Sequence, residues 1–405
     1  MKPTLAVALS AIAVGVVASA LVLHSRRSQT QTTNSSAKKT EAAVSYLQRD
    51  DAAERAAAES QRVVPDGALV VTKTHGVATV VSYDAATQHY TVCPQHKDDE
   101  ASVESLEIGA DGLEEVRVRE MFVYPIKSCR GIRLEKAKIT ERGISNDRTW
   151  MFTDEAGTFI TQRRYHKMAL IDPLLDDMEN PTSITLRAEG MPDLVVPILR
   201  EGEGVERPVR VWKSHLTAID QGDAASDWIN TFLAEERKEK SFRFVRMKES
   251  GHRPTNPKFA PEHETAFADG YPFLLTLNAS IDAANEVLED KIPMNRFRPN
   301  IVVDGAPAFA DETWNCLIIG GLRFRNVKPC DRCSMPCVDQ ATGVIHKGHE
   351  PQKTLTKIRN GKALGFENGT KHSYYFGSNL VAEQLGHLEV GAPVKVLTLK
   401  SAVYA

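Results

Sequence analysis

Cysteine is scarce in this sequence, and its spacing does not suggest a disulfide framework. Only six cysteines occur in 405 residues, and no regular interval separates them. The thiols are therefore expected to be reduced, in a compartment that faces the cytosol. The formal net charge of -3 gives no global reason to expect a nucleic-acid partner.

Several motifs that bind cofactors are also missing. The sequence contains no GxGxxG, no P-loop and no CxxCH motif, so nothing indicates a nucleotide site or a haem of its own. It shows no internal repeat either. The length is sufficient for two or three domains, each with its own core.

One long apolar run stands at the N-terminus. Residues 5–23 carry no charge, and as a helix they would span roughly 28 Å, about the thickness of a bilayer core. The length favours an uncleaved membrane anchor, and a cleaved signal peptide is the alternative. Basic residues stand mostly behind the run, so the positive-inside rule leaves the body on the cytosolic side. These residues are Lys2 before it and Arg26, Arg27, Lys38 and Lys39 after it.

The next stretches differ in composition from the rest of the chain. Residues 28–63 read as a polar linker followed by an Ala/Glu/Arg-rich helix. Residues 64–95 contain short β-prone runs separated by turn residues, which predicts a small SH3-like barrel or β-meander. Residues 96–115 are acidic and poor in apolar residues, so they are expected to form a linker.

From residue 116 onward, strands are expected to outnumber helices, which predicts a mainly β, α+β body rather than a doubly wound parallel sheet. Helices are expected at 223–238, where an Asp caps the first turn, and at 278–290. The expected strands lie at 116–124, 134–140, 148–154, 158–163, 183–188, 193–199, 209–214, 297–305, 316–327 and 391–400.

Three of the six cysteines lie within eight residues, in KPCDRCSMPCVDQATG (328–343). Cys330, Cys333 and Cys337 supply three of the four ligands of a structural zinc site, and His346 or His349 could complete it. A Cys330–Cys333 disulfide is disfavoured by a reducing compartment. Two further interpretations remain open: ordinary buried thiols, or one exposed thiolate stabilised by the cations Arg332 and Lys328.

Several separated motifs resemble, in order, those of the MOSC (molybdenum cofactor sulfurase C-terminal) proteins, and most of all the mitochondrial amidoxime-reducing components. These are YPIKSCRG (124–131), GISNDRTWMF (143–152), NRFRPNIVVDG (295–305), the cysteine segment, FGSNL (376–380) and VGAPVKVL (390–397). The resemblance covers about the last 290 residues. It implies a MOSC N-terminal β-rich domain at 116–222 and a MOSC β-barrel at 223–405, behind the anchor at 1–27.

The resemblance implies a molybdenum cofactor, a pyranopterin with a phosphate tail. Cys333 would ligate the metal, and Asp339 would accept a proton-bearing group of the substrate near the metal. The residues implied for cofactor binding are Lys127, Ser128, Arg148, Asn278, Arg298, Asp331, Arg332 and Asn379. Arginine suits phosphate and pterin edges, and the helix start at Asn278 would receive a phosphate. Taken one at a time, these residues have ordinary structural interpretations. The basic residues would be surface groups, Asn278 would be a helix cap, and Asp339 would be a turn residue.

The activity implied is the two-electron reduction of N-hydroxylated compounds such as amidoximes and hydroxylamines. The implied electron donors are cytochrome b5 and its NADH-dependent reductase, and the implied location is the mitochondrial outer membrane. The chain departs from the pattern at Met335, Pro336 and Cys337, where many relatives have small or hydroxyl residues. Cys337 is thus a second thiol close to the implied metal ligand. The property that it would affect is substrate preference.

Two other functions stay open. One is sulfur carriage by a persulfide on Cys333, although residues 1–115 are too short for the pyridoxal-phosphate domain of a sulfurase. The other is a non-enzymatic membrane scaffold that uses residues 64–95 as a docking surface.

Overall fold

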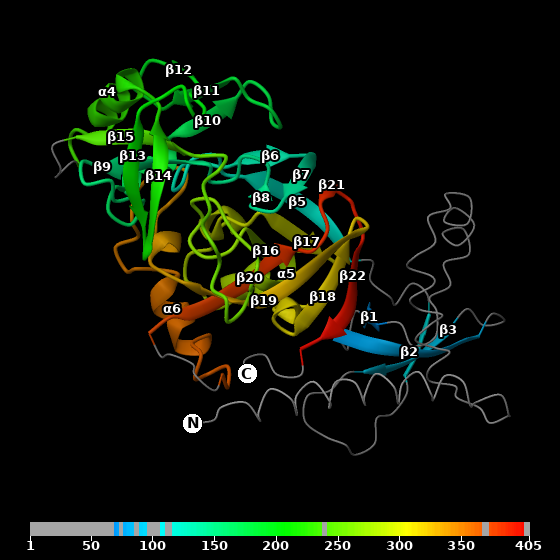
Figure 1. Cartoon of the computed structure of the whole chain (residues 1–405). Helices are drawn as coiled ribbons and strands as arrows, with labels where there is room; N and C mark the ends of the chain where they lie inside the picture. The colour runs from blue at the N-terminus through cyan, green and yellow to red at the C-terminus, as the bar shows by residue number, and fades with distance from the viewer. Residues whose placement is uncertain are drawn as a thin grey trace, which may run out of the picture. The chain divides into compact units, whose positions relative to one another are not determined.

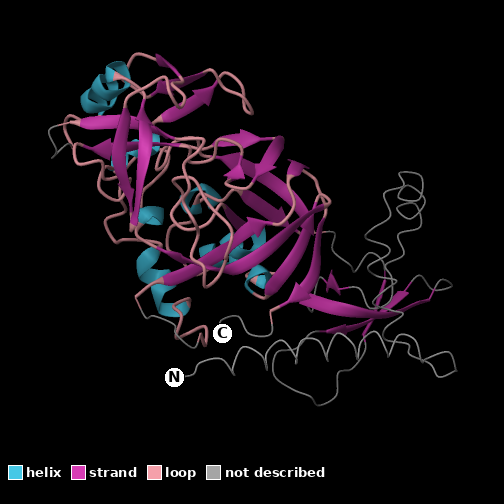
Figure 2. Cartoon of the chain, in the orientation of Figure 1, coloured by secondary structure: helices cyan, strands magenta, loops and turns pink. Residues whose placement is uncertain are grey.

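The computed structural model describes residues 69–72, 76–84, 89–94 and 106–109, and then 116–236, 241–366 and 372–400. The predicted anchor at 5–23, the linker at 28–39 and the helix at 40–62 lie outside these residues. Among the helices that the model describes, none combines the length and hydropathy needed to cross a bilayer. Strands dominate the described chain (Figure 2), so the prediction of a mainly β, α+β fold is confirmed.

The first four strands form a sheet of their own. They are β1 (Leu69–Thr72), β2 (Gly76–Asp84), β3 (His89–Pro94) and β4 (Leu106–Gly109). The strands pair antiparallel in the order β1-β2-β3-β4, which is a simple meander. The fourth strand lies within the stretch 96–115, for which a linker was predicted, so that part of the prediction is wrong.

Sheets of the N-terminal half follow. Their strands are β5 (Arg117–Val123), β6 (Ile132–Leu134), β7 (Lys136–Thr140), β8 (Gly143–Ile144), β9 (Trp150–Asp154), β10 (Asp172–Leu175), β11 (Ser183–Arg187), β12 (Leu194–Pro197), β13 (Glu206–Val211), β14 (Ser214–Asp220) and β15 (Phe242–Met247). One sheet has the order β10-β11-β12 and another the order β13-β14-β15-β9. Because β15 lies in the second sheet, the domain boundary predicted after residue 222 cuts through that sheet.

An eight-stranded sheet joins the two halves of the body. Its order is β22-β18-β19-β20-β16-β17-β5-β6, so the cyan and red ends of the described body share one sheet (Figure 1). The added strands are β16 (Phe273–Leu277), β17 (Ile301–Asp304), β18 (Trp314–Ile319), β19 (Leu322–Arg332), β20 (Tyr374–Ala382) and β22 (Val394–Leu399). A smaller sheet has the order β21-β7-β8, with β21 at Gly386–Glu389.

Helices are short and few among the described residues. They are α4 (Asp223–Phe232), α5 (Asn278–Asn285), α6 (Gln352–Ile358) and the 3-10 turns η2 (His166–Leu170), η3 (Met294–Phe297), η4 (Ala310–Glu312) and η5 (Met335–Cys337). The residue before α4 is Gly222, with no side-chain cap, so the capping role predicted for Asp223 is wrong. The helix ends at Phe232, earlier than predicted. It still buries Trp228 and Ile229, as its apolar face requires, and Leu233 at its C-cap is buried too.

The run 158–163 is not a strand. Its backbone makes two isolated bridges, Thr153 to Phe159 and Thr158 to Arg210, and no continuous ladder. Alternation alone does not produce a strand when no neighbouring segment runs alongside it for several residues.

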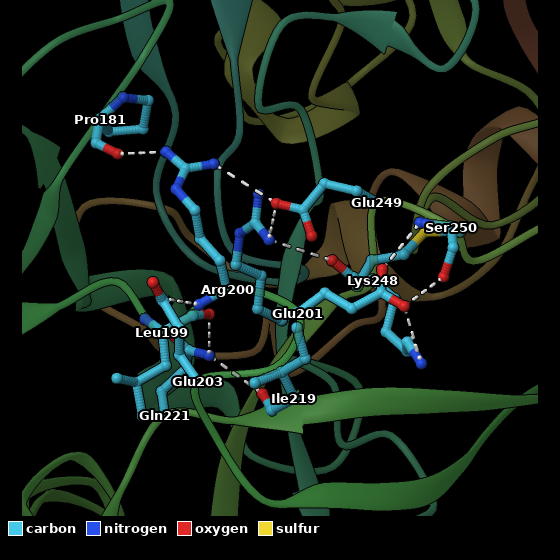
Figure 3. Close-up of polar contacts among 12 residues, drawn as sticks. Pro181, Leu199, Arg200, Glu201, Glu203, Ile219, Gln221, Lys248, Glu249 and Ser250 are labelled. Carbon is cyan, nitrogen blue, oxygen red and sulfur yellow. Dashed lines mark hydrogen bonds and ion pairs between the residues drawn. The ribbon is translucent and has the colours of Figure 1, made fainter.

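The loop between β12 and β13 is fixed to the segment after β15 by a polar network (Figure 3). Glu201 accepts hydrogen bonds from the amide and hydroxyl of Ser250 at 3.1 and 2.6 Å and pairs with Lys248 at 3.0 Å. The Ser250 hydroxyl and Lys248 together lower the pKa of Glu201 to about 2. Glu249 pairs with Arg246 at 2.7 Å. These contacts order the loop but include none of the predicted site residues.

Candidate functional site

Cys333 follows directly after the last residue of β19 and is half-buried. Its Sγ accepts a hydrogen bond from the backbone amide of Met335, with an N···S distance of 3.4 Å. A backbone donor of this kind stabilises a thiolate without adding a formal charge. The following η5 turn, with Pro336 in its first turn, is tightly wound and directs this amide at the sulfur.

The two neighbouring cysteines have different surroundings. Cys330 is half-buried, and its Sγ accepts a hydrogen bond from Nη1 of Arg332 at 3.2 Å. Cys337 is buried, and its Sγ donates to the carbonyl of His349 at 3.3 Å. Burial raises the pKa of both thiols, against the opposing charge of Arg332 at Cys330. The described cysteines are all free thiols, so no Cys330–Cys333 disulfide is formed.

The hydrogen bonds of Arg332 go to groups other than Cys333. Its guanidinium donates to Cys330 Sγ and to the carbonyl of Phe297, the latter at 2.7 Å. Its charge interacts with Cys333 as well as with Cys330, in the direction that the sequence suggested. The side chains of residues two apart in a strand share a face, so Arg332 reaches back to Cys330 rather than forward to its neighbour. The geometry does not support the zinc interpretation. Within the described ranges, no three His, Cys, Asp or Glu side chains are grouped so that they could hold a metal ion.

Two of the predicted arginines converge on one buried tyrosine. The guanidinium carbons of Arg148 and Arg298 lie 4.2 and 4.3 Å from the ring centroid of Tyr124. Both arginines have left-handed backbones, with φ of 47° and 56°, an uncommon conformation for residues with side chains. Burial raises the pKa of Tyr124 to about 12 although the charges of Arg298, Arg148 and Arg332 oppose the shift. Thus all three predicted arginines act on one region.

The partners of these two arginines differ. Arg148 pairs with Asp147 at 2.6 Å and also donates to Asn300 Oδ1 at 3.1 Å. Arg298 is buried, and its side chain donates a long hydrogen bond, 3.5 Å, from Nη1 to Gln340 Oε1. Its Nη2 is buried and has no partner among the described residues. Burial lowers the pKa of Arg298 to about 10, so it stays charged at neutral pH.

The turn after β5 contributes Lys127 and Ser128. Lys127 is buried, and its Nζ donates to Asp269 Oδ1 at 2.5 Å and to the carbonyl of Phe267 at 2.8 Å. Burial lowers the pKa of this lysine, and Asp269 opposes that shift. The charge inside an apolar run, which suggested a cofactor contact, therefore has a partner within the protein.

Ser128 has a left-handed φ of 67° and a buried hydroxyl that no described residue satisfies. A chain of amides links it to Arg298. The carbonyl of Ser128 accepts from Gln162 Nε2 at 2.7 Å, and Gln162 and Gln340 exchange hydrogen bonds of 3.1 and 3.0 Å. Gln340 in turn accepts from Arg298. Ser128 and Arg298 thus belong to one polar network.

The orphan donors test whether these residues fit an anionic, hydrogen-bonding cofactor. Ser128 Oγ, Arg298 Nη2 and Arg332 Nε are buried and have no hydrogen-bond partner within the described chain. A buried donor without a partner costs on the order of 1–3 kcal/mol, so folded proteins rarely leave one unsatisfied. All three belong to the residues implied for cofactor binding. The donor set therefore fits a ligand rich in acceptors, such as a pterin with a phosphate tail.

Three other predicted residues make no hydrogen bond with these donors within the described chain. Asp331 is exposed and pairs with Lys328 at 2.8 Å. Asn379 lies on β20 and donates to the carbonyl of Lys328 at 3.5 Å. Asn278 is the first residue of α5. Leu277 holds the cap position without a side-chain cap, so the capping role considered for Asn278 is wrong. Their cofactor roles stay predictions.

Asp339 has structural partners for both carboxylate oxygens. Oδ1 accepts from the amides of Ala341 and Thr342 at 2.8 and 3.0 Å, and Oδ2 pairs with Arg296 at 2.7 Å. Burial acts to raise the pKa of Asp339, but these hydrogen bonds and the charge of Arg296 outweigh it and lower the pKa. The geometry is that of the turn residue considered from the sequence, and a catalytic role stays a prediction.

Sequence reasoning missed four residues that organise the site: Tyr124, Gln162, Arg296 and Gln340. Tyr124 and Gln340 stand inside the motifs YPIKSCRG and the cysteine segment, so the motifs contained a signal. Arg296 donates to the carbonyl of Pro336 at 3.2 Å and so holds the cysteine loop. Gln162 lay in a run misread as a strand.

The mainly β body carries a half-buried cysteine, Cys333, next in sequence to Arg332, and Arg332, Arg298 and Ser128 each have a buried polar atom without a partner among the described residues. Two family models match the chain: the MOSC N-terminal beta barrel domain over residues 115–236 and the MOSC domain over residues 262–395. The first match includes α4, which the sequence analysis assigned to the second domain.

Individual relatives agree with these matches. Mitochondrial amidoxime reducing component 2 of Bos taurus is 33% identical over 289 residues, 68% of this chain and 82% of the relative. Mitochondrial amidoxime-reducing component 1 of Homo sapiens is 32% identical over 289 residues, 69% of this chain and 82% of the relative. Molybdenum cofactor sulfurase of Bos taurus is 29% identical over 245 residues, 56% of this chain and 27% of that protein. The chain belongs to the MOSC-domain family of molybdenum-cofactor-associated proteins, with amidoxime-reducing components among its relatives, as the motifs predicted.

Proposed function

We propose that the chain is a molybdenum-cofactor-dependent reductase of N-hydroxylated compounds such as amidoximes and hydroxylamines. The observation that carries the proposal is the set of unsatisfied buried donors at Ser128, Arg298 and Arg332, all on motif residues. The names of the relatives, amidoxime-reducing components, support the substrate class.

Each residue would have a distinct task in holding the cofactor. Cys333 would offer its thiolate as the protein ligand of the metal, with the Met335 amide holding the sulfur in place. Arg298 and Ser128 would donate from their free atoms to acceptors of the pterin or its phosphate. Arg148 is already engaged by Asp147 and Asn300, so it would supply charge and orient Arg298, whose carbonyl it binds at 3.2 Å. The bound cofactor supplies the two-electron redox chemistry.

The reaction balances with electrons and protons from outside the chain. The N–O bond breaks, two electrons and two protons are taken up, and the reduced nitrogen compound and water leave. The sequence carries no flavin or haem motif, so a partner must deliver the electrons. Cytochrome b5 and its NADH-dependent reductase are proposed as that source. Anchoring on the same membrane would raise their effective concentration.

The activity is tested with purified full-length protein from a host that makes the cofactor. We expect reduction of an N-hydroxyamidine with a chemical reductant, and faster turnover with cytochrome b5, its reductase and NADH. The variant Arg298→Ala removes a free buried donor and is expected to reduce cofactor content and turnover together. Absence of N-hydroxyamidine reduction in protein that contains molybdenum would contradict the proposed substrate class.

A sulfur carrier is the second candidate, because the sulfurase relative aligns over 56% of this chain. Cys333 would then hold a persulfide instead of a metal. Cyanide-labile sulfur in protein free of molybdenum would favour this function over the reductase.

A further inference from the structure

One buried tyrosine beside the cysteine segment has no assigned role. Tyr374 is the first residue of β20 and pairs directly with Arg332 of β19 in the antiparallel ladder. Directly opposed side chains project from the same face of a sheet, with Cβ atoms about 5 Å apart. Tyr374 is fully buried, and its hydroxyl has no hydrogen-bond partner among the described residues.

The polar groups around this hydroxyl are those of the candidate site. The charged and titratable groups that act on it are Arg332, Cys337, Cys333 and Cys330. None of the three sulfurs makes a hydrogen bond with it in the structure. Burial raises the pKa of Tyr374, so the hydroxyl keeps its proton and is a donor without an acceptor. It thus joins Ser128 Oγ, Arg298 Nη2 and Arg332 Nε as a fourth unsatisfied buried group of the site.

A second tyrosine shows why the surroundings matter. Tyr165 is also fully buried with an unpartnered hydroxyl. It lies in the apolar core of the N-terminal domain, with its ring centroid 5.2 Å from that of Phe242. Tyr165 is therefore a matched case of a buried, unpartnered hydroxyl that lies outside the cysteine segment.

We propose that Tyr374 is a hydrogen-bond donor reserved for the ligand of the cysteine site, and that its acceptor is an oxygen of that ligand. The inference rests on the proposed function. The oxygen belongs either to the cofactor or to the N-hydroxylated substrate. The donor would then come from β20, directly opposite Arg332 of β19.

The test compares wild type, Tyr374→Phe and the control Tyr165→Phe as full-length proteins, each with and without cofactor. Cofactor-free protein comes from a host that cannot make the cofactor. Removing an unsatisfied hydroxyl should raise the melting temperature of cofactor-free protein by roughly 2 °C in both variants. Tyr165→Phe should give the same gain in the loaded protein. Tyr374→Phe should lose that gain if its acceptor is on the cofactor, and its cofactor content should fall.

If the acceptor is on the substrate, Tyr374→Phe keeps its cofactor and its melting gain, but KM for an N-hydroxyamidine rises roughly 3- to 10-fold. Tyr165→Phe leaves KM unchanged in either case. The inference is overturned if both variants agree in melting shift, cofactor content and KM. It is also overturned if Tyr374→Phe destabilises the cofactor-free protein, since that reveals an acceptor within the chain. Wild type without molybdenum overturns the proposed function and the inference together, and the metal assay separates that outcome from the others.

Discussion

At the scale of single residues, charges in apolar runs had two different explanations. Lys127 and Arg298 both suggested a cofactor contact from sequence, because a buried charge needs a compensating group. For Lys127 that group is Asp269, 142 residues further along the chain, and no sequence pattern indicates such a pairing. For Arg298 one donor stays unsatisfied. The same sequence signal therefore marks a structural ion pair in one case and a buried donor without a partner among the described residues in the other.

A second buried charged group lies outside the candidate site and was not predicted. Asp311 is buried, with Oδ2 accepting from the Ser378 hydroxyl at 2.6 Å and Oδ1 without a partner in the described chain. Burial, reinforced by the charge of Glu312, raises the pKa of Asp311 to about 7. The folded state therefore holds this proton up to about pH 7, whereas the unfolded chain releases it near pH 4.

This difference makes stability depend on pH. Between about pH 4 and 7 the folded state binds more protons than the unfolded state, so the free energy of unfolding falls as pH rises. We expect the free energy of unfolding of wild type to fall by on the order of 2 kcal/mol more between pH 5 and 8 than that of Asp311→Asn, because the variant lacks this proton. Urea unfolding at several pH values measures it, with the exposed Asp304→Asn as control. Parallel curves for wild type and Asp311→Asn would show that the carboxyl is not perturbed.

At the scale of elements, alternation indicated a strand with one solvent face, whereas two strands with almost no solvent face were missed. The run 117–123 alternates in burial and was predicted as β5. The strands β16 and β20 are buried along almost their whole length. A strand buried on both faces shows no period of two, so alternation cannot reveal it. Tyr374, on β20, was missed for this reason.

Turn geometry was the least predictable feature of the site. The motifs indicated which residues belong together, but not that Ser128, Arg148 and Arg298 adopt left-handed backbones. Such conformations in residues with side chains persist where the surroundings impose them, and they often mark functional positions. They turn two guanidinium groups toward the ring of Tyr124, which no spacing rule indicates.

At the scale of the whole molecule, the order of strands follows from contacts between distant parts of the chain. The sheet that contains β5 also contains β16 to β20 and β22, and this brings the turn at Ser128 into one polar network with Arg298. Sequence periodicity gave the fold class but not this order, because pairing between distant strands leaves no local pattern.

The attachment of the molecule to a membrane is a further proposal at this scale. The run 5–23, with basic residues behind it, is proposed to anchor the chain in the mitochondrial outer membrane with the body facing the cytosol. The relatives carry the word mitochondrial in their names. We expect protease treatment of intact mitochondria to degrade or release the body. If the body resists protease until the membrane is opened, the proposed orientation is wrong.

The central claim is that Cys333 alone of the three cysteines holds molybdenum. Its surroundings support this: Cys333 is half-buried and its sulfur accepts from a backbone amide, Cys330 is engaged by Arg332, and Cys337 is buried against His349. Serine replaces a soft thiolate with a hard, protonated hydroxyl.

The most direct measurement is the molybdenum and pterin content per chain of the full-length wild type and of Cys330→Ser, Cys333→Ser and Cys337→Ser, with melting temperatures alongside. We predict about one molybdenum per chain for wild type, Cys330→Ser and Cys337→Ser. Cys333→Ser should lose either its molybdenum or its enzymatic turnover. Without cofactor, this variant should melt at the same temperature as cofactor-free wild type. Wild type without molybdenum, or equal loss of metal and stability in all three variants as a structural zinc site would give, would contradict the account.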